Sequence, residues 1–252
     1  MFYGRENERK KLCTMFHSDG QMISLIYGRR RIGKSELIKQ VLKETDIKSV
    51  YYECKQTTEQ NNVDSLAELI GEAFDFPKPA FENMEDLLCF LFQKSEKEPM
   101  ILVLDEYPYL RENSKGLDSV LQSVIDHYKD TSNMKLIVCG SYVDTMKALL
   151  ERQNPLYGRI DLTLNLKPMD YYDSALFYPE FSEEDKVRLF SVFGGIPYYN
   201  RLIDEKKSVR ENIIELIASS GARLENEVAM YLNSEISKIT RVLHLNMFVI
   251  TG

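Results

Sequence analysis

Residues 22–35 read MISLIYGRRRIGKS, which predicts an apolar strand, a loop bounded by glycines and the start of a helix. The loop fits the phosphate-binding pattern of one glycine, four further residues and then Gly-Lys-Ser, formed here by Gly28, Gly33, Lys34 and Ser35. Glycine permits a sharp turn at position 28 and a close approach of the backbone to an anion at position 33. Backbone N–H groups would cradle phosphates, Lys34 would reach the β- and γ-phosphates, and Ser35 would hold Mg²⁺. The alternative is a basic loop that binds nothing.

Strand-like and helix-like stretches alternate around this loop. Strands are expected at residues 22–27, 49–54, 100–104, 135–139 and 161–166. Helices are expected at residues 9–18, 37–42, 63–74, 84–92, 117–128 and 143–152. Strands that alternate with helices form parallel βαβ units, so the predicted fold class is α/β with a parallel sheet.

Two carboxylates, Asp105 and Glu106, follow the fully apolar run MILVL of residues 100–104. Such a run is typical of a central parallel strand covered on both faces, and ligands bind at the carboxyl ends of such strands. We therefore expect Asp105 to hold Mg²⁺ through water and Glu106 to orient the attacking water or accept its proton. The alternative is a pair of solvated carboxylates at a strand end.

Other polar side chains have two interpretations each. Ser141 ends the next strand, and it either faces the γ-phosphate and the water or is an ordinary turn serine. Arg159, in the loop PLYGR, either stabilises transition-state charge in a neighbouring subunit or forms a surface salt bridge. The arginines inside the phosphate loop either add positive field near phosphate or point to solvent, which is the favoured interpretation: Arg29, Arg30 and Arg31.

The composition is that of an acidic chain of ordinary hydrophobicity. It has 252 residues, a formal net charge of −7 and 44% hydrophobic residues, which suggests one or two domains with a sizeable core. The charge argues against non-specific binding of nucleic acid or membrane by the whole surface. No signal peptide opens the chain and no apolar run reaches the ~18 residues of a membrane span. The four cysteines are scattered like free thiols, so we expect a cytoplasmic protein.

After Pro168 the pattern changes to helices alone. They are expected at residues 171–178, 183–193, 199–204 and 209–218, with the sequence GGIP at 194–197 as a break. No strand is expected between residues 169 and 220. The chain therefore continues into a small helical domain.

Six short motifs together resemble the archaeal-type ATPases of the AAA+/STAND group: FYGRENE, GRRRIGKS, ILVLDE, CGS, PLYGR and GGIPYY. The resemblance runs from Phe2 to about Glu227. It implies a P-loop NTPase domain of AAA+/ASCE type with a five-stranded sheet at residues 1–167, a helical lid at 168–212 and a winged-helix region from 213 to 252. It also implies that the phosphate-loop strand lies centrally, with the strands before Asp105 and Ser141 on one side and residues 161–166 on the other.

The resemblance also implies roles for single residues. Asp105 and Glu106 match the Walker B pair, Ser141 matches the sensor, and Arg159 matches an arginine-finger position. Phosphates and Mg²⁺ would be bound by Gly28, Arg29, Arg30, Arg31, Ile32, Gly33, Lys34, Ser35 and Glu36. The ends of the nucleotide would be contacted by two further pairs: Gly4 and Arg5 near the adenine, and Gly195 and Pro197 in the box by which the lid touches the nucleotide.

The C-terminal part departs from the family pattern. Residues 213–236 resemble the start of a winged helix, but the final SKITRVLHLNMFVITG lacks the expected further helices and the wing. We expect a truncated or divergent winged-helix region, and no residues for a nuclease activity.

Two functions remain open at this stage. The first is binding and hydrolysis of Mg-ATP between the sheet domain and the lid, with a change in the angle between them. The second is a nucleotide-gated ADP/ATP switch, or a DNA-associated regulatory module, with little turnover of its own. The expected cofactors are ATP or ADP and Mg²⁺, and the choice of ATP over GTP rests on the resemblance. A homo-oligomer and a protein or DNA partner are candidates, although the overall charge does not favour DNA; no membrane partner is expected.

Overall fold

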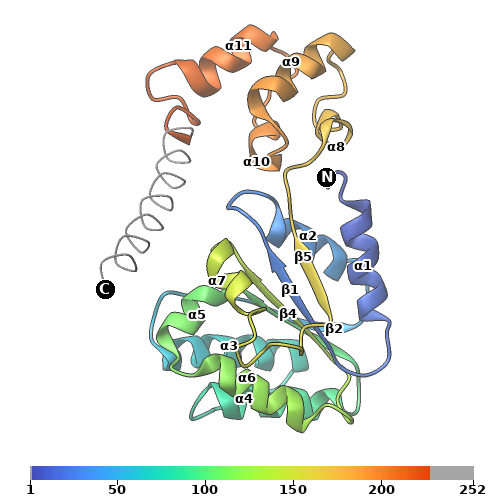
Figure 1. Ribbon diagram of the computed structural model, residues 1–252, viewed down its shortest axis with the longest axis vertical. Helices are drawn as coiled ribbons and strands as arrows, with labels where there is room; N and C mark the ends of the chain where they lie inside the picture. The colour runs from blue at the N-terminus through green and yellow to red at the C-terminus, as the bar shows by residue number, and fades with distance from the viewer. Residues whose placement is uncertain (1, 228–252) are drawn as a thin grey trace, which may run out of the picture. The chain divides into compact units, whose positions relative to one another are not determined.

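The computed structural model describes residues 2–227; residue 1 and residues 228–252 lie outside the described part. The chain divides into two compact units, one from Met1 to Pro168 and one from Met169 on (Figure 1). The predicted winged-helix region therefore lies outside the described residues from position 228 on. Within residues 2–227 no helix is both long enough and apolar enough to cross a membrane.

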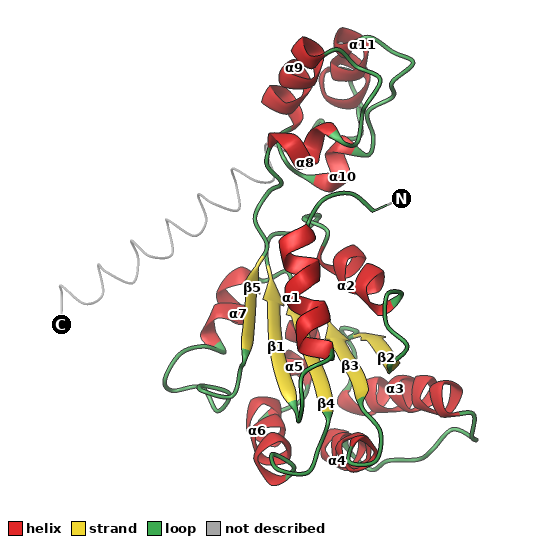
Figure 2. Cartoon of the chain, turned by 90° about the vertical axis from the view of Figure 1, so that its right-hand side faces the viewer, coloured by secondary structure: helices red, strands yellow, loops and turns green. Residues whose placement is uncertain are grey.

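The first unit is built on a five-stranded sheet whose strands are β1 (Met22–Tyr27), β2 (Lys48–Glu53), β3 (Met100–Asp105), β4 (Met134–Gly140) and β5 (Leu162–Asn165). The strands run side by side in the order β2-β3-β4-β1-β5, and every pairing is parallel (Figure 2). This confirms the predicted α/β class. It also confirms the implied sheet order, because β1 lies between β4 and β5 with β3 beyond β4.

Helices cover both faces of this sheet. On one face, α3 (Glu59–Phe74), α4 (Met84–Ser95) and α6 (Leu117–His127) share a core with inward strand residues such as Leu102 and Leu136. On the other face, α2 (Lys34–Leu42) contacts β3, and α1 (Glu6–Phe16) packs against α2. Every residue of β3 and β4 is buried, as expected of central strands. Burial of each leucine in these two strands contributes roughly 1.5–3 kcal/mol to the stability of the fold.

The helix α5 (Tyr107–Asn113) is absent from the sequence prediction. It begins directly after Glu106, and Pro108 stands in its first turn, where a missing N–H costs no hydrogen bond. The helix α7 (Val143–Ala148), which follows β4, ends four residues before the predicted end at residue 152. Both helices start where a strand that leads into the candidate site ends.

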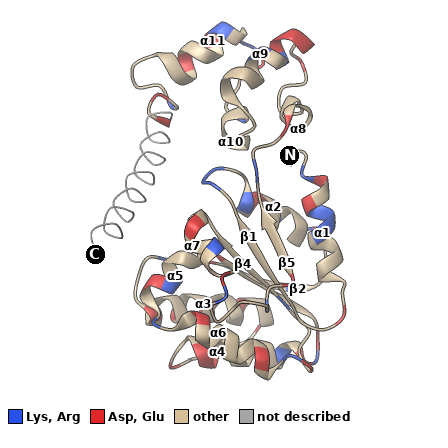
Figure 3. Cartoon of the chain, in the orientation of Figure 1, with Lys and Arg blue, Asp and Glu red and all other residues tan. Residues whose placement is uncertain are grey.

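The second unit is helical in the part that the structure describes, residues 169–227. Its elements are α8 (Tyr171–Ala175), α9 (Glu183–Phe193), α10 (Pro197–Asn200), α11 (Val209–Ile213) and the π-helical turn η1 (Ile214–Ala218). Helix α9 has the predicted bounds; Ser182 caps it, and acidic residues in its first turn complement the helix dipole (Figure 3). Helix α10 begins at Pro197, two residues before the predicted helix at 199–204.

Candidate active site

The carboxyl ends of β1, β3 and β4 bring the phosphate loop, the acidic pair and Ser141 to one edge of the sheet. Lys34 Nζ donates a hydrogen bond of 2.7 Å to Ser141 Oγ, which in turn donates one of 2.7 Å to Glu106 Oε1. Ser35 Oγ donates to Asp105 Oδ2 at 2.6 Å. Residues predicted from three separate stretches are therefore in direct contact.

Both glycines of the loop stand where a side chain would collide or be strained. A Cβ on Gly28 would lie 2.5 Å from the carbonyl oxygen of Leu166, so Gly28 lets the loop pass close to the segment after β5. The left-handed backbone occurs instead at Gly33 (φ 90°) and at Arg31 (φ 69°). Left-handed backbone thus occurs at position 33 and the close approach to a neighbouring segment at position 28. The approach of the loop backbone to an anion at Gly33 stays a prediction.

Lys34 is folded back over its own loop. Its side chain is 4% exposed, and its ammonium donates to the carbonyl oxygens of Gly28 at 3.1 Å and Arg29 at 3.3 Å as well as to Ser141. These bonds satisfy a buried cation without a carboxylate partner. The ammonium is therefore held at the centre of the loop, where the motif predicts the phosphates.

Asp105 is a buried carboxylate that accepts hydrogen bonds on both oxygens. Its side chain is 2% exposed; Oδ1 accepts the N–H of Glu106 at 2.9 Å, and Oδ2 accepts the Ser35 hydroxyl. Hydroxyl and carboxylate oxygens are ligands that suit Mg²⁺, which is commonly held by one or two carboxylates, waters and substrate phosphates. The residues present therefore fit the predicted metal site.

Tyr51 of β2 completes this contact, and sequence reasoning misses it. Its hydroxyl donates to Asp105 Oδ2. Burial, followed by the nearby Asp105 charge, raises the pKa of Tyr51 far above its usual range, so the phenol stays protonated. Alternation predicts that Tyr51 and Tyr52 face opposite sides of the sheet, but only the pairing of β2 with β3 decides which tyrosine faces Asp105.

Glu106 turns away from the path of β3. Its backbone is left-handed, with φ 51°, a conformation that costs a side-chain-bearing residue roughly 1–2 kcal/mol. Its carboxylate accepts two hydrogen bonds from Ser141. The hydroxyl donates to Oε1, and the backbone N–H donates to Oε2 at 3.2 Å. Asp105 and Glu106 are thus adjacent in sequence yet contact different elements, α2 and the end of β4.

The motif FYGRENE near the start of the chain (residues 2–8) is bound to the phosphate loop through Arg5. Gly4 and Arg5 both have left-handed backbone, with φ 63° and 61°. The buried Arg5 guanidinium donates to the carbonyl oxygens of Ile32 at 3.3 Å and Lys167 at 2.5 Å. This ties α1, the loop and the end of the sheet unit together; a contact with adenine stays a prediction.

The other side chains of the loop differ in exposure. Arg30 and Arg31 are exposed and Arg29 is half-buried, so the loop between β1 and α2 presents a basic surface (blue in Figure 3). Ile32 is fully buried, and Glu36 is exposed in the first turn of α2. The solvated-face interpretation therefore describes Arg30 and Arg31.

Arg159 is not brought to the phosphate loop of its own chain. It precedes β5 and so lies at the amino ends of the strands, whereas the candidate site lies at their carboxyl ends. Its guanidinium makes two hydrogen bonds to Asp126, at 2.8 and 2.7 Å. The Arg159 hydrogen bonds hold the pKa of Asp126 below its usual value. Its Nη1 also donates to the carbonyl oxygens of Pro155 and Tyr157. In this chain Arg159 makes the salt bridge of the second interpretation; its action in a neighbouring subunit stays a prediction.

Gly195 and Pro197 belong to the second unit and shape its first segment. A Cβ on Gly195 would collide with the backbone of Met169, whose N–H donates to the Gly195 carbonyl at 2.8 Å. Pro197 begins α10. Both residues have clear structural roles within this unit, and their contact with a nucleotide stays a prediction.

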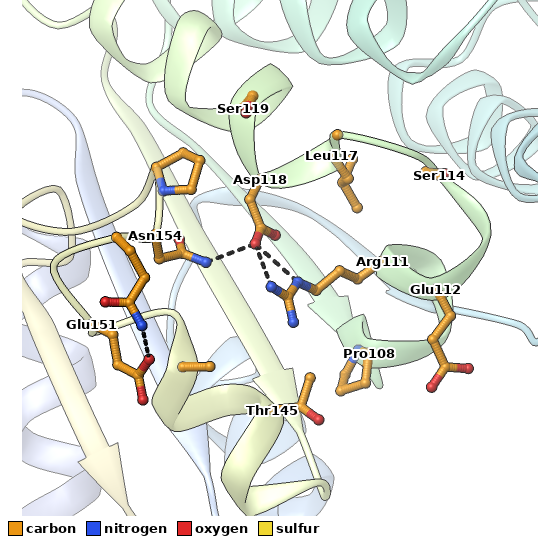
Figure 4. Close-up of a pocket in the computed structure, with 14 residues that line it drawn as sticks. Pro108, Arg111, Glu112, Ser114, Leu117, Asp118, Ser119, Thr145, Glu151 and Asn154 are labelled. Carbon is orange, nitrogen blue, oxygen red and sulfur yellow. Dashed lines mark hydrogen bonds and ion pairs between the residues drawn. The ribbon is translucent and has the colours of Figure 1, made fainter. Parts of the chain in front are cut away.

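A hollow of about 640 Å³ lies beside α5, α6 and the residues after α7 (Figure 4). In its wall Asp118 accepts hydrogen bonds from Arg111 Nε at 2.9 Å and Asn154 Nδ2 at 2.8 Å. The buried Tyr107, next to Glu106 in sequence, donates to the other Asp118 oxygen at 2.8 Å. These bonds fix the start of α5, and with it the segment that carries Glu106.

Known proteins resemble this chain in sequence and in fold. Residues 2–203 match the profile of an ATPase domain found predominantly in Archaea. The uncharacterized protein MJECL04 of Methanocaldococcus jannaschii is 30% identical over 200 residues, which are 79% of this chain and 43% of that protein. The chain therefore spans less than half the length of this relative.

Solved structures share the fold. The Walker-type ATPase PABY2304 of Pyrococcus abyssi gives a TM-score of 0.63 at 21% identity, over 95% of this chain and 76% of that one. The ORC2 protein of Aeropyrum pernix, solved in ADPNP–ADP complexes, gives 0.58 at 16% identity, over 91% of this chain and 63% of that one. At these identities the likeness establishes the fold, whereas the profile match covers most of the sequence. The chain belongs to the family of ATPase domains found predominantly in Archaea.

Proposed function

We propose that this chain binds Mg-ATP at the edge formed by the phosphate loop, Asp105, Glu106 and Ser141, and hydrolyses it to ADP and phosphate. The observation that carries the proposal is the hydrogen-bond chain from Lys34 through Ser141 to Glu106, beside the contact of Ser35 with Asp105. A cation, two hydroxyls and two carboxylates meet there at a loop with the phosphate-binding pattern.

The proposed reaction is an in-line displacement at the γ-phosphorus. Water forms the new bond to phosphorus, the bond to the β-phosphate oxygen breaks, and Glu106 orients the water and accepts its proton. Lys34 and the loop N–H groups stabilise the charge on the phosphate oxygens. Ser35, and Asp105 through water, would hold Mg²⁺, which would supply further positive charge to those oxygens.

Ser141 is proposed to report the γ-phosphate to Glu106. In the structure its hydroxyl accepts from Lys34 and both of its donors are used by the Glu106 carboxylate. A γ-phosphate oxygen offers Lys34 and Ser141 a charged acceptor, and charge-assisted bonds are the stronger ones. Binding of ATP would then free a Glu106 oxygen to accept a water.

The finer parts of the proposal concern the ends of the nucleotide and the second unit. Gly4 and Arg5 are proposed to lie near adenine, because the motif FYGRENE at residues 2–8 is shared with the family. ATP is proposed to be preferred over GTP for the same reason. Gly195 and Pro197, in the proposed lid of residues 168–212, are proposed to respond to nucleotide, so that hydrolysis moves the lid. Arg159 is proposed to act in a neighbouring subunit, which makes a homo-oligomer the working assembly.

A nucleotide-gated switch with little turnover is the second candidate function. Two observations favour it: both Glu106 oxygens accept bonds from Ser141, and Arg159 is paired with Asp126. A partner would then be needed to raise turnover. The ORC1 protein of Aeropyrum pernix was solved in complex with DNA, which suggests DNA as such a partner, whereas a net charge of −7 weighs against it.

Two variants test the proposed roles. Lys34→Ala should weaken ATP binding about tenfold or more, because a charge-assisted bond to phosphate is lost. Glu106→Gln should keep nucleotide affinity and lower turnover by about 10²–10⁴. Equilibrium binding of a fluorescent ATP analogue and steady-state hydrolysis measure both, with Lys43→Ala, an exposed lysine at the end of α2, as control. Unchanged affinity in Lys34→Ala, or wild-type turnover in Glu106→Gln, would contradict the assignment.

A further inference from the structure

Strand β2 contributes a functional group to the candidate site through Tyr51. The Tyr51 hydroxyl donates to Asp105 Oδ2, the same oxygen that accepts the Ser35 hydroxyl at 2.6 Å. The N–H of Glu106 holds the other oxygen. Asp105 therefore has three donors, one each from its own backbone turn, from α2 and from β2.

The Tyr51 ring is itself held in place by α2. Lys39 Nζ lies 5.0 Å from the centre of the ring, which is within the range of a cation–π contact. Ser35 and Lys39 are four residues apart in α2 and so lie on the same face of the helix. The phosphate-loop helix thus contacts the Tyr51–Asp105 pair at two points, one on each partner.

We propose that Tyr51 is a positioning residue for the metal site: it fixes the Asp105 carboxylate beside the Ser35 hydroxyl and thereby sets the Mg²⁺-dependent part of nucleotide affinity. This inference rests on the proposed binding of Mg-ATP. With only the backbone N–H and Ser35 as donors, the carboxylate keeps more freedom to turn about its Cβ–Cγ bond. The third donor, on a rigid ring anchored in the neighbouring strand, removes that freedom before any ligand arrives.

The chain offers a matched control on the same strand. Tyr52 lies on the opposite face of β2, is 2% exposed, and donates its hydroxyl to Asn62 Oδ1 at 2.6 Å. Tyr51→Phe and Tyr52→Phe each remove one hydroxyl from one phenol in β2. Only the first removes a donor from Asp105, and it leaves the ring that contacts Lys39.

The test compares the affinity of a fluorescent ADP analogue in Mg²⁺ with its affinity in EDTA. Tyr51→Phe should lower the gain given by Mg²⁺ about tenfold, the loss expected for one bond to a charged group, and leave affinity in EDTA unchanged. Tyr52→Phe should leave both affinities unchanged. In the background of Asp105→Asn, Tyr51→Phe should cost much less, because a residue that acts through Asp105 is not additive with it.

Three results would overturn the inference. The first is a Tyr51→Phe variant in which Mg²⁺ raises nucleotide affinity as much as in the wild type, and the second is one in which Mg²⁺ raises it more. The third is that Tyr51→Phe lowers the Mg²⁺-dependent affinity equally in the wild type and in the Asp105→Asn background. An increased gain would mean that Tyr51 competes with the metal for Asp105 rather than positioning it. Failure of the proposed function is separate: the wild-type chain would then bind no nucleotide, or Lys34→Ala would bind it equally well.

Discussion

At the scale of single residues, Ser141 is the side chain that connects Lys34 of the phosphate loop to Glu106. Its hydroxyl accepts from Lys34 and donates to Glu106, and its N–H donates to the same carboxylate. Lys34 keeps two carbonyl acceptors of its own without it. Ser141 is therefore more important for linking the two groups than for holding either one.

Ser141→Ala should lower steady-state ATP turnover about tenfold while ADP affinity changes less than threefold. The hydroxyl link to Glu106 is lost, at the cost of about one hydrogen bond to a charged group, whereas Lys34 remains anchored on the loop. Hydrolysis and equilibrium binding measure the two quantities. Ser119→Ala, on α6 away from this contact, is the control. Wild-type turnover in Ser141→Ala would make Ser141 an ordinary turn serine.

Asp126→Asn tests the resting contact of Arg159. The pair is exposed enough that its loss should lower the free energy of unfolding by no more than about 1 kcal/mol at neutral pH. Because Arg159 lowers the pKa of Asp126 in the folded chain, this contribution is complete above the unfolded value, near 3.8, and is lost as the pH falls through the folded value. Urea unfolding of both proteins from pH 7 to pH 3 measures it. A difference that stays constant or grows as the pH falls would contradict the ion-pair account.

At the scale of elements, β3 and β4 are the most completely buried strands of the sheet. Both are buried along their whole length, whereas the edge strand β5 has only one fully buried residue, Leu164. Loss of side-chain volume in β3 leaves a cavity that neighbouring strands on both sides prevent from closing. The carboxyl end of β3 carries Asp105, so the same burial holds the acidic pair in place.

Leu102→Ala should destabilise the chain by about 2–5 kcal/mol, because it removes a fully buried side chain from β3. Leu162→Ala, at the half-buried start of β5, should cost less than about 1.5 kcal/mol. Denaturant unfolding of the two variants provides the comparison. Equal losses, or a larger loss at Leu162, would contradict the placement of the core.

Elements with a complete hydrophobic pattern are predicted from sequence, and the others are not. The run MILVL gives β3 to within one residue, and the apolar stripe of α9 gives both its ends. The helix α5 is not predicted from sequence because YPYLREN is too short for a full amphipathic repeat. Its first residue is set by the left-handed turn at Glu106 rather than by a sequence pattern. Boundaries near the site shift because tertiary hydrogen bonds, rather than periodicity, end those elements.

The candidate site is predictable where it follows a local motif and unpredictable where it depends on pairing. Lys34, Ser35 and the acidic pair are found from short patterns. The contact of Tyr51 with Asp105 joins residues 54 positions apart and depends on the register of β2 with β3. The contact of Arg159 with Asp126 likewise joins a loop to the end of α6, and no local pattern indicates it.

At the scale of the whole molecule, the question is whether one chain makes a complete ATPase. One unit brings together the side chains of the candidate site: Lys34, Ser35, Asp105, Glu106 and Ser141. Arg159 lies at the amino ends of the strands of the same sheet and is paired with Asp126. The proposed role of Arg159 therefore requires a neighbouring copy of the chain. In the proposed mechanism assembly is part of catalysis, so turnover per subunit should depend on protein concentration.

Steady-state ATP hydrolysis per subunit, measured across a wide range of protein concentrations with Lys34→Ala as the blank, tests this account most directly. The account predicts turnover above the blank that rises with concentration and then levels off, with the rise absent in Arg159→Ala. Turnover above the blank that does not depend on concentration would contradict the role of Arg159 alone. Saturable ATP binding with no turnover above the blank at any concentration would contradict the central claim that this chain hydrolyses ATP.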